Sequence, residues 1–440
     1  MNNQLLLGTS KMNITPKSPV PLAGFEKRKG VFEGIRKPLY ARCWLFQQAS
    51  SNGSTLQSLF VQADIIWWGT ERVEALKQRI QQEYGIASIV LHATHTHTGP
   101  QTSELFIPSL GEYDETYVRM MEEKLLQGIS AAKANMDPVH IERGRGSCRI
   151  GIHRRKRVND RILMKPNEDG EFDPEVHAFR FVKYDGKVKG VMFHYTCHPT
   201  TTKENYVSPE FPGIAMELVE ERYGNAAIAS YLQGCCGDVR PALIQDEEFI
   251  DGTFQDVDEL GQKLGREVLH ILEAPMERLA PNLQALQRKS IVLPIAALPD
   301  EQELARAEQR EGAIAEWGRL LLDHPSRVQP HATLEMSLMR IANGLAFLGL
   351  NGEPVLRYGL TVKALSGGQV LPLGYTDGMI GYIPTAAQLE EGGYESIDSH
   401  YYFGLAGPFA PEAETVIMEQ LRAMLGGPVY ADPLQEGGVC

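Results

Sequence analysis

Apolar and polar positions follow two different periods along this chain, one typical of buried strands and one typical of amphipathic helices. Residues 59–66 form an almost continuous apolar run, which predicts a buried strand. The following segment has apolar residues at helical spacing and ends at Gly85, so it predicts a helix that Thr70 caps. A second apolar run at 87–92 predicts another strand, and the region therefore has the order strand, helix, strand.

The same two periods predict most of the remaining elements. Helices are expected at about 114–133, 212–223, 255–272, 299–322 and 411–424. Strands are expected at 179–184, 188–195, 226–232 and 341–350, and the first two form a hairpin around Asp185-Gly186. This alternation predicts an α/β fold with a mixed sheet core flanked by helices. The loops at the strand ends carry polar residues, and such loops are where active sites of α/β proteins usually lie.

The chain shows no internal repeat and no low-complexity linker. We therefore expect residues 1–426 to form a single domain. The Pro- and Gly-containing segment 427–440 is expected to be an extended C-terminal tail.

Composition narrows the classes of protein to consider. With 43% hydrophobic residues, the 440-residue chain can bury a substantial core, and its net charge of −13 without a basic run argues against nucleic-acid binding. No window approaches the roughly 20 apolar residues of a transmembrane helix, and the N-terminus lacks a signal-peptide pattern. The six cysteines are too irregularly spaced for a secreted disulfide framework. We therefore expect a cytoplasmic protein.

Three histidines, His92, His95 and His97, lie at the end of the strand predicted at 87–92. If strand geometry persists, His95 and His97 point the same way, and the threonines between them can hydrogen-bond the ring N–H groups. Two imidazoles in one pocket favour a metal site over a simple strand end that binds water. The continuation of this motif differs from the Asp-His pair of metallo-β-lactamase-type sites.

A second histidine cluster follows the strand predicted at 188–195. His194 and His198 have the spacing of a helical zinc motif, but the local pattern is that of a strand, so only His198 is a ligand candidate. Cys197 fits a small buried residue better than a zinc ligand. The glycine-rich turn at 233–241 contains two adjacent cysteines, for which packing is favoured over a nucleophilic role.

Taken in order, these and further motifs resemble the neutral/alkaline non-lysosomal ceramidase family over most of the chain. The matching segments are residues 8–16 with 22–25, 94–100, 233–241, 351–353, and 381–385 with 393–395. The resemblance implies that zinc is held by four side chains, those of His95, His198, Glu353 and Tyr382. It also implies that three residues surround the substrate amide, namely His97, Arg154 and Tyr394.

Two positions of this match need comment. Arg154 is matched through Ile152-His153-Arg154, with His153 where the family has Asn, and the basic run 154–157 is equally consistent with a solvated surface loop. Pro209 stands where some family members carry a serine proposed as nucleophile, although Ser208 precedes it. This departure disfavours a serine-nucleophile mechanism. Relatives of the eukaryotic type also carry a further β-sandwich domain, so this sequence resembles the catalytic domain alone.

The resemblance implies hydrolysis of an N-acyl amide by a metal-activated water, with ceramide as the leading example of a lipid-like or small-molecule substrate. His97, near its reference pKa of about 6.5, is then a proton shuttle. Asp64 either orients a ligand imidazole or makes an ordinary loop hydrogen bond. Trp67 and Trp68 either line an apolar mouth or belong to the core.

Two alternatives remain open at this point. One is a metal-dependent esterase, lactonase or phosphoesterase, which a second metal ion would favour. The other is a non-catalytic binding protein with structural zinc, although structural sites are usually closed and rich in cysteine. The acyl chain length and the oligomeric state do not follow from the sequence.

Overall fold

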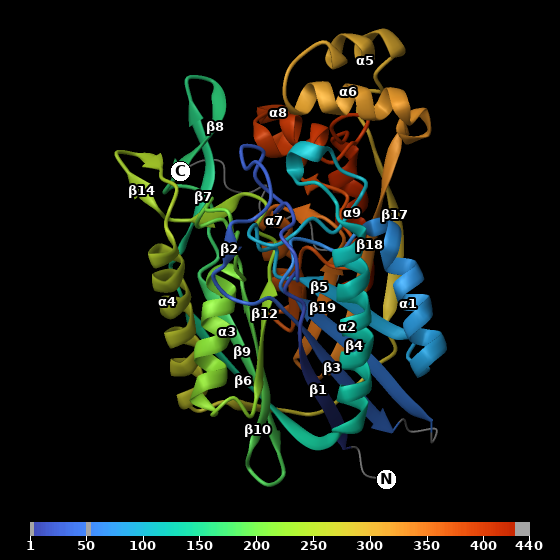
Figure 1. Cartoon of the computed structure of the whole chain (residues 1–440). Helices are drawn as coiled ribbons and strands as arrows, with labels where there is room; N and C mark the ends of the chain where they lie inside the picture. Colours follow the sequence, from blue (N-terminus) through green and yellow to red (C-terminus); the bar gives the residue numbers. More distant parts are fainter. Residues whose placement is uncertain (1–3, 50–53, 427–440) are drawn as a thin grey trace.

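The computed structural model describes residues 4–49 and 54–426, and within them two β-sheets pack face to face while helices cover their outer faces (Figure 1). This mixed α/β architecture confirms the fold class expected from the sequence. The tail expected at 427–440 lies outside the described residues.

The larger sheet is mixed, with parallel pairs at both ends of a mostly antiparallel order, β12-β10-β9-β6-β1-β3-β4-β5, and β16 added beside β6. Its strands are β1 (Leu5–Asn13), β3 (Tyr40–Ala49), β4 (Thr55–Ala63), β5 (Ser88–Ala93), β6 (Asp137–Ser147), β9 (Glu175–Lys183), β10 (Val188–Tyr195), β12 (Ile228–Gln233) and β16 (Glu277–Leu279).

The second sheet has four strands in the order β17-β18-β19-β21. They are β17 (Gln287–Pro294), β18 (His331–Ala342), β19 (Leu345–Leu350) and β21 (Val370–Leu373). A third sheet has three strands in the order β13 (Val239–Pro241), β7 (Gly151–Val158) and β8 (Arg161–Asn167). Three pairs of short strands complete the ladders: β20 (Glu353–Pro354) with β22 (Tyr382–Ile383), β2 (Gly34–Ile35) with β11 (Tyr206–Val207), and β14 (Ile244–Gln245) with β15 (Glu248–Phe249).

The helices form the outer layers. They are α1 (Thr70–Tyr84), α2 (Glu115–Ala134), α3 (Glu210–Arg222), α4 (Phe254–Glu273), α5 (Glu301–Glu308), α6 (Ala313–Asp323), α7 (Leu356–Ser366), α8 (Ala386–Glu391) and α9 (Glu412–Leu425). Helix α2 packs on β1 and β3, α3 and α4 pack beside the β9–β12 end of the large sheet, and α7 and α9 pack on the second sheet. The pair α5 and α6 lies at the top of the molecule in Figure 1.

Alternating side chains explain this layering, because successive residues of a strand face opposite sides of a sheet. In β4, Phe60 packs against Phe347 of β19 between the two sheets, with ring centroids 5.0 Å apart. Its neighbours Leu59 and Val61 join the core under the helices instead. The second half of β4 is therefore covered on both faces, which accounts for the continuous apolar run in this part of the sequence.

The carboxyl ends of strands from both sheets meet at one place. The main-chain N–H of Gln233, which ends β12, donates to His92 Nε2 of β5 at 2.9 Å. His92 also forms a β-bridge with Thr376, just beyond β21. In the same region the N–H of Gly237 donates to the carbonyl of Pro354 at 3.0 Å. The polar loops that follow these strands are thereby brought together.

Several predicted elements are confirmed to within a few residues. The hairpin of β9 and β10 turns at Asp185-Gly186, and Gly186 has the positive φ of 83° that this turn favours. Helix α2 begins after Asp114, whose side chain accepts a hydrogen bond from the N–H of Tyr117.

Three expectations are wrong in detail. The helix expected at 299–322 is two helices, α5 and α6, because the chain turns between them and Gly312 adopts a φ of 66°. The strand expected at 341–350 belongs to two strands, β18 and β19, joined by the two-residue turn Asn343-Gly344. Thr70 does not cap α1: its hydroxyl bonds the main chain of Met379, and Gly69 occupies the cap position.

No helix in the described parts of the chain combines the length and the apolar character needed to cross a bilayer.

Candidate metal centre

His95 and His97 come together in one pocket, but not through strand geometry. Strand β5 ends at Ala93, and His95 has a φ of 65°, in the left-handed region that non-glycine residues rarely adopt. The N–H of His95 donates to the carbonyl of Ile65 at 3.0 Å, which holds this conformation. The expectation that the strand pleat would continue through His95 is therefore wrong, while the two imidazoles still converge.

Three imidazoles form the centre of the site. His95, His97 and His198 each place a ring nitrogen within 4.8 Å of a ring nitrogen on both of the others. His95 and His198 have no exposed surface, and His97 is 8% exposed. We expected His97 to lie only beside the metal. The structure places it in the same cluster as the two expected histidine ligands, His95 and His198.

Main-chain carbonyls fix the orientation of all three rings. The Nδ1 of His95 lies 2.9 Å from the carbonyl oxygen of Ile66, and the Nδ1 of His97 lies 3.1 Å from that of Gly24. The Nδ1 of His198 lies 2.6 Å from the carbonyl oxygen of Cys236. Because a carbonyl oxygen can only accept, each Nδ1 must carry the proton, and each neutral ring therefore has a lone pair on Nε2.

These lone pairs point at one another. The Nε2 atoms of His95 and His97 are 3.1 Å apart. Glu353 Oε2 lies 3.1 Å from the Nε2 of His198 and 3.5 Å from that of His95. Buried acceptors at such distances repel unless a proton or a cation lies between them. Zinc and related divalent metals prefer a donor set of two or more imidazole nitrogens together with a carboxylate oxygen. The residues at this site therefore fit a metal ion.

Burial and neighbouring charges hold these groups in the protonation states that a metal needs. Burial, reinforced by His95 and His198, lowers the pKa of His97 well below its ordinary value, so the expectation that it titrates near 6.5 is wrong for the metal-free site. Burial, reinforced by Arg154, lowers the pKa of His198 to about 4. Burial alone would raise the pKa of Glu353, but the adjacent histidines lower it well below its usual range.

Tyr382 reaches the centre through pairing with Glu353. The two residues are directly opposite in the parallel ladder of β20 and β22, and the N–H of Glu353 donates to the carbonyl of Gly381 at 2.8 Å. The Tyr382 ring stacks on that of His198 with centroids 6.4 Å apart. Its hydroxyl accepts from Arg154 Nη2 at 3.0 Å. All four side chains expected to hold a metal therefore gather in one buried place.

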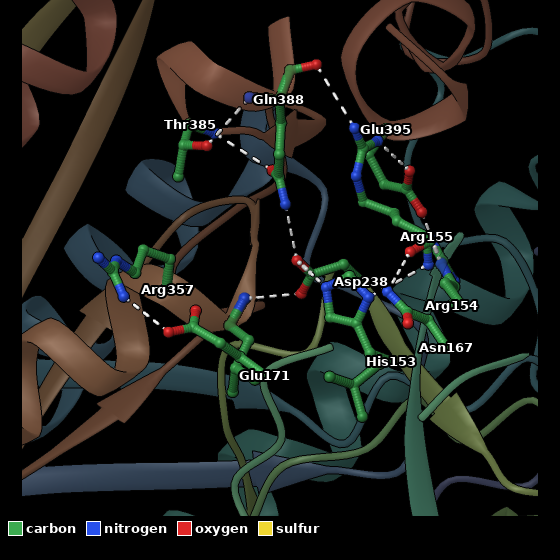
Figure 2. A network of polar contacts seen from close by, with 12 residues as sticks. His153, Arg154, Arg155, Asn167, Glu171, Asp238, Arg357, Thr385, Gln388 and Glu395 are labelled. Atoms are coloured by element: carbon green, nitrogen blue, oxygen red, sulfur yellow. Dashed lines mark hydrogen bonds and ion pairs between the residues drawn. The ribbon is translucent and has the colours of Figure 1, made fainter. Parts of the chain in front are cut away.

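Arg154 is a buried member of the site rather than part of a solvated loop. It lies on β7 and is 4% exposed, and its Nε donates to Glu395 Oε1 at 2.7 Å (Figure 2). Arg155 is equally buried and donates to the other oxygen of Glu395 at 2.8 Å, whereas Arg157 is exposed. Only the end of the basic run therefore fits the surface-loop interpretation.

The neighbouring His153 anchors the same strand from its other side. Its Nε2 lies 3.3 Å from Asp238 Oδ2, which also accepts from Gln388 at 2.8 Å (Figure 2). Asp238 further accepts from the N–H of Leu356 at the start of α7. Asp238 belongs to the turn 233–241, so this turn connects β7 to the segment that carries Tyr382.

Tyr394 lies at the outer edge of the site. Its ring meets that of Tyr382 edge to face, with centroids 5.4 Å apart, and the guanidinium carbon of Arg154 lies 5.9 Å from its centre. Burial raises the pKa of its hydroxyl, so Tyr394 is protonated and able to donate at neutral pH. It also lines a cavity of about 290 Å³ that opens beside the site.

Of the two roles left open for Asp64, the structure supports the ordinary one, and the threonine contacts expected in the histidine loop are wrong. Asp64 does not orient a ligand imidazole: it accepts from the N–H of Tyr40 and from the buried guanidinium of Arg42, as an ordinary structural carboxylate does. The threonines of the histidine loop do not hold the rings either, because Thr96 and Thr98 both donate to the carbonyl of Ser208. Main-chain carbonyls orient the imidazole rings instead.

The candidate nucleophiles are poorly suited to that role. Cys197, Cys235 and Cys236 are buried, and burial raises the pKa of each thiol, which disfavours the thiolate. Ser208 is also buried, and its hydroxyl accepts from the N–H of Glu210 at 3.1 Å. Trp67 and Trp68 are buried in the core rather than lining an open mouth, although the Trp67 ring lies 6.0 Å from that of His95.

Tyr375 and Glu395 contact the site but were not singled out from the sequence. The Tyr375 ring stacks on that of His95 with centroids 3.8 Å apart, and its hydroxyl lies 3.0 Å from Cys236 Sγ. The only sequence signal for Tyr375 is its place in the turn-rich stretch 374–378. Glu395 directly follows Tyr394, but a carboxylate there has no distinguishing pattern.

Comparisons with known proteins agree with these observations. The sequence model described as "Neutral/alkaline non-lysosomal ceramidase, N-terminal" matches residues 5–254. A neutral ceramidase from Pseudomonas aeruginosa is 23% identical over 331 residues, which cover 71% of this chain and 48% of the relative. The match thus spans about half the length of that relative.

Two solved structures share the fold. The crystal structure of neutral ceramidase from Pseudomonas aeruginosa superposes with a TM-score of 0.75 at 19% identity and covers 99% of this chain and 76% of its own. A ceramidase complexed with C2 superposes with a TM-score of 0.74 at 17% identity and covers 98% of this chain and 77% of its own. At such identities the likeness establishes the fold alone.

Proposed function

Because this chain belongs to the neutral/alkaline non-lysosomal ceramidase family, we propose that it hydrolyses the amide bond of a linear N-acyl amide, of which ceramide is the leading example. The metal is zinc, and its ligands are the side chains of His95, His198, Glu353 and Tyr382. Three further residues act on the substrate amide, namely His97, Arg154 and Tyr394.

One observation carries this proposal: unprotonated Nε2 atoms and an ionised carboxylate meet without a proton donor among them. The sp² lone pairs of His95 and His198 converge with Glu353 Oε2, and only a cation satisfies them all at neutral pH. When bound, zinc would supply Lewis acidity, which polarises a carbonyl and lowers the pKa of a water molecule to about 7.

Arg154 is placed to stabilise the negative charge that develops on the amide oxygen. Its Nε and Nη2 are occupied by Glu395 and Tyr382, while its Nη1 makes no hydrogen bond within residues 4–49 and 54–426. Because Glu395 already fixes the guanidinium, no reorganisation is needed during the reaction. Such a preorganised donor contributes on the order of 3 kcal/mol to the transition state.

His97 and Tyr394 complete the reacting group. His97 has a free lone pair on Nε2 and can take a proton there while Gly24 holds its Nδ1–H. Tyr394 offers a protonated hydroxyl on the cavity side, where the amine leaving group or the carbonyl oxygen would lie. A role of His97 as a further ligand is the competing assignment, and metal content in His97→Gln separates the two.

The test is hydrolysis of a fluorogenic N-acyl amide panel by the full chain. Activity should be lost after treatment with a chelator and should return on addition of zinc, with one zinc per chain by elemental analysis. Full activity of a sample shown to be metal-free would contradict the mechanism. Two metal ions per chain, with cleavage of esters or phosphoesters and no amide, would instead support an esterase or phosphoesterase.

A further inference from the structure

A cavity of about 290 Å³ lies directly beside the candidate metal centre. Its lining includes Tyr394 and Gly24, and the carbonyl of Gly24 holds the Nδ1 of His97. A Cβ at Gly24 would lie only 2.2 Å from that Nδ1, so the main chain closely approaches the imidazole here. A molecule in this cavity therefore contacts residues that touch the reacting centre. Its volume is at the lower end of ligand pockets, which suits a small polar group better than a long chain.

The lining of this cavity is rich in positive charge. It contains Lys27, Arg28 and Lys203, and the carboxylate in the lining is that of Glu26. Two of these cations surround one aromatic ring: the Arg28 guanidinium carbon lies 4.9 Å, and Lys203 Nζ 6.0 Å, from the centre of Phe25. Like charges gathered in this way repel one another unless an anion lies between them.

Protein carboxylates compensate this charge only in part. Glu26 accepts from the hydroxyl of Tyr402 at 2.9 Å, and Lys203 pairs with Asp251, which lies outside the lining, at 2.8 Å. Among the described residues, neither Lys27 nor Arg28 forms an ion pair. Within the lining itself, three cations stand against the single carboxylate of Glu26, which leaves an excess of positive charge in a chain whose net charge is −13.

Arg28 has unused hydrogen-bonding capacity on one edge. Its Nη1 donates to the carbonyls of Ala23 and His97, at 3.2 and 2.6 Å. Its Nε and Nη2 are buried and make no hydrogen bond to a described residue. Burial lowers the pKa of Arg28 to about 10, partly offset by Glu210, so the guanidinium stays charged at neutral pH. The Nε–Nη2 edge is one that a planar carboxylate can bind with both oxygens.

We propose that the substrate of this site carries a carboxylate close to the scissile amide, and that Arg28, Lys27 and Lys203 bind it. This inference rests on the proposed amide hydrolysis and narrows its substrate class: N-acyl amino acids and related amide-containing acids are preferred over neutral amides such as ceramide. The carboxylate supplies the acceptors that Arg28 lacks and neutralises the excess charge of the cavity.

The first experiment compares three substrates with the same alkyl chain on the zinc-loaded full chain. They are an N-acylglycine, the neutral N-acylglycinamide, and a monoamide of a dicarboxylic acid, which carries its carboxylate on the acyl side. We expect kcat/KM for at least one acid to exceed that of the neutral compound about tenfold, with a gap that narrows as salt increases.

The outcomes separate this inference from the proposed function. Equal or faster hydrolysis of the neutral compound would overturn the carboxylate preference and leave amide hydrolysis standing. Hydrolysis of none of the three, nor of any amide in the fluorogenic panel, would overturn the proposed function and this inference with it. A preference for either acid supports the inference and shows on which side of the amide the carboxylate lies.

The second experiment assigns the effect to the cavity. Lys27→Met and Lys203→Met are each expected to lower the ratio of kcat/KM for the acid over the neutral compound several-fold, mainly through KM. Lys29→Met is the matched control, because it removes the same charge from an exposed residue outside this lining. An equal fall of the ratio in Lys29→Met would overturn the assignment, since the effect would then reflect overall charge.

Discussion

The two walls of the candidate site are oriented in different ways. The histidine wall (His95, His97 and His198) is held by main-chain carbonyls, one or more for each Nδ1. The arginine wall (Arg154, Tyr382, Tyr394 and Glu395) is held by side chains, through an ion pair and a hydrogen bond between residues more than 200 positions apart. Main-chain bonds persist when neighbouring side chains change, whereas a side-chain network fails when one member is lost. The orientation of the arginine wall is therefore the more easily lost through a single substitution.

The largest effect is expected at the proposed metal ligands. His95→Ala or Glu353→Ala should remove a donor from the convergent set, so the metal and the activity are lost together. We expect kcat/KM to fall by about 10³-fold or more, because the reaction then lacks its Lewis acid. Elemental analysis of the purified variants, run beside the kinetic assay, measures both losses.

Tyr394→Phe is the control from the arginine wall. It should retain the metal and lose about 10²-fold in kcat, the size expected for one donor to a developing charge. Metal retained in Glu353→Ala, or lost in Tyr394→Phe, would contradict the proposed division between metal ligands and residues that act on the substrate.

A smaller effect on catalysis and a large effect on stability are expected from Glu395→Gln. This change leaves Arg154 and Arg155 charged and without their shared carboxylate in a buried place. We expect the free energy of unfolding to fall by about 3 kcal/mol and kcat to fall about tenfold, with the metal retained. Urea unfolding and elemental analysis provide the measurements.

Glu391→Gln is the matched control for that variant. Glu391 also pairs with Arg155, at 3.3 Å, but its side chain is 37% exposed. An exposed pair contributes roughly 1 kcal/mol or less, so this variant should be close to the parent protein. If both variants lost equal stability, the burial of Glu395 would not be the cause.

The smallest effect is a pH dependence of stability that arises beside the arginine wall, at the pair of His153 and Asp238. Burial alone would lower the pKa of His153, but its contact with Asp238 raises it, while the pKa of Asp238 is lowered. A raised histidine pKa stabilises the fold below its unfolded value of about 6.5, and this stability is lost as pH rises through the folded pKa. The Asp238 contribution is present above about 3.8 and is lost as pH falls.

The stabilising effect of the pair is therefore greatest between about pH 4 and 6.5. We expect the parent protein to exceed His153→Gln in unfolding free energy by more at pH 5.5 than at pH 8.5, by about 1 kcal/mol, the typical size of one hydrogen bond. Urea titrations at the two pH values test this. A difference that grows with pH would have the wrong sign and would exclude the pair as its origin.

Local signals in the sequence were sufficient for much of the fold. The Asp185-Gly186 hairpin and the helix after Asp114 depend on nearby residues, and both were predicted to within a few positions. The break at Gly312 and the turn at Asn343-Gly344 were missed, because helical or apolar periodicity on both sides concealed them. Periodicity indicates the type of an element better than where one element ends and the next begins.

The same distinction applies to the site. His95 and His97 lie in one short motif, so the histidine loop was recognisable from its own residues. Glu353 and Tyr382 were identified only through the family resemblance, and their roles stay predictions. Tyr375 and Glu395 contact the site because segments distant in the sequence meet there. Glu395 lies in the matched segment 393–395, but nothing in that match assigns its carboxylate a role.

The parallel pairing of Glu353 with Tyr382 has a consequence for how this protein can diversify. The intervening chain leaves and returns to the same ladder, so its length does not set the spacing of the two donors. Gly367, at the end of α7, has open space around it, and an insertion there would enlarge an outer surface at modest cost in loop entropy. Descendants of this chain can thus remodel their exterior while they inherit an unchanged reaction centre.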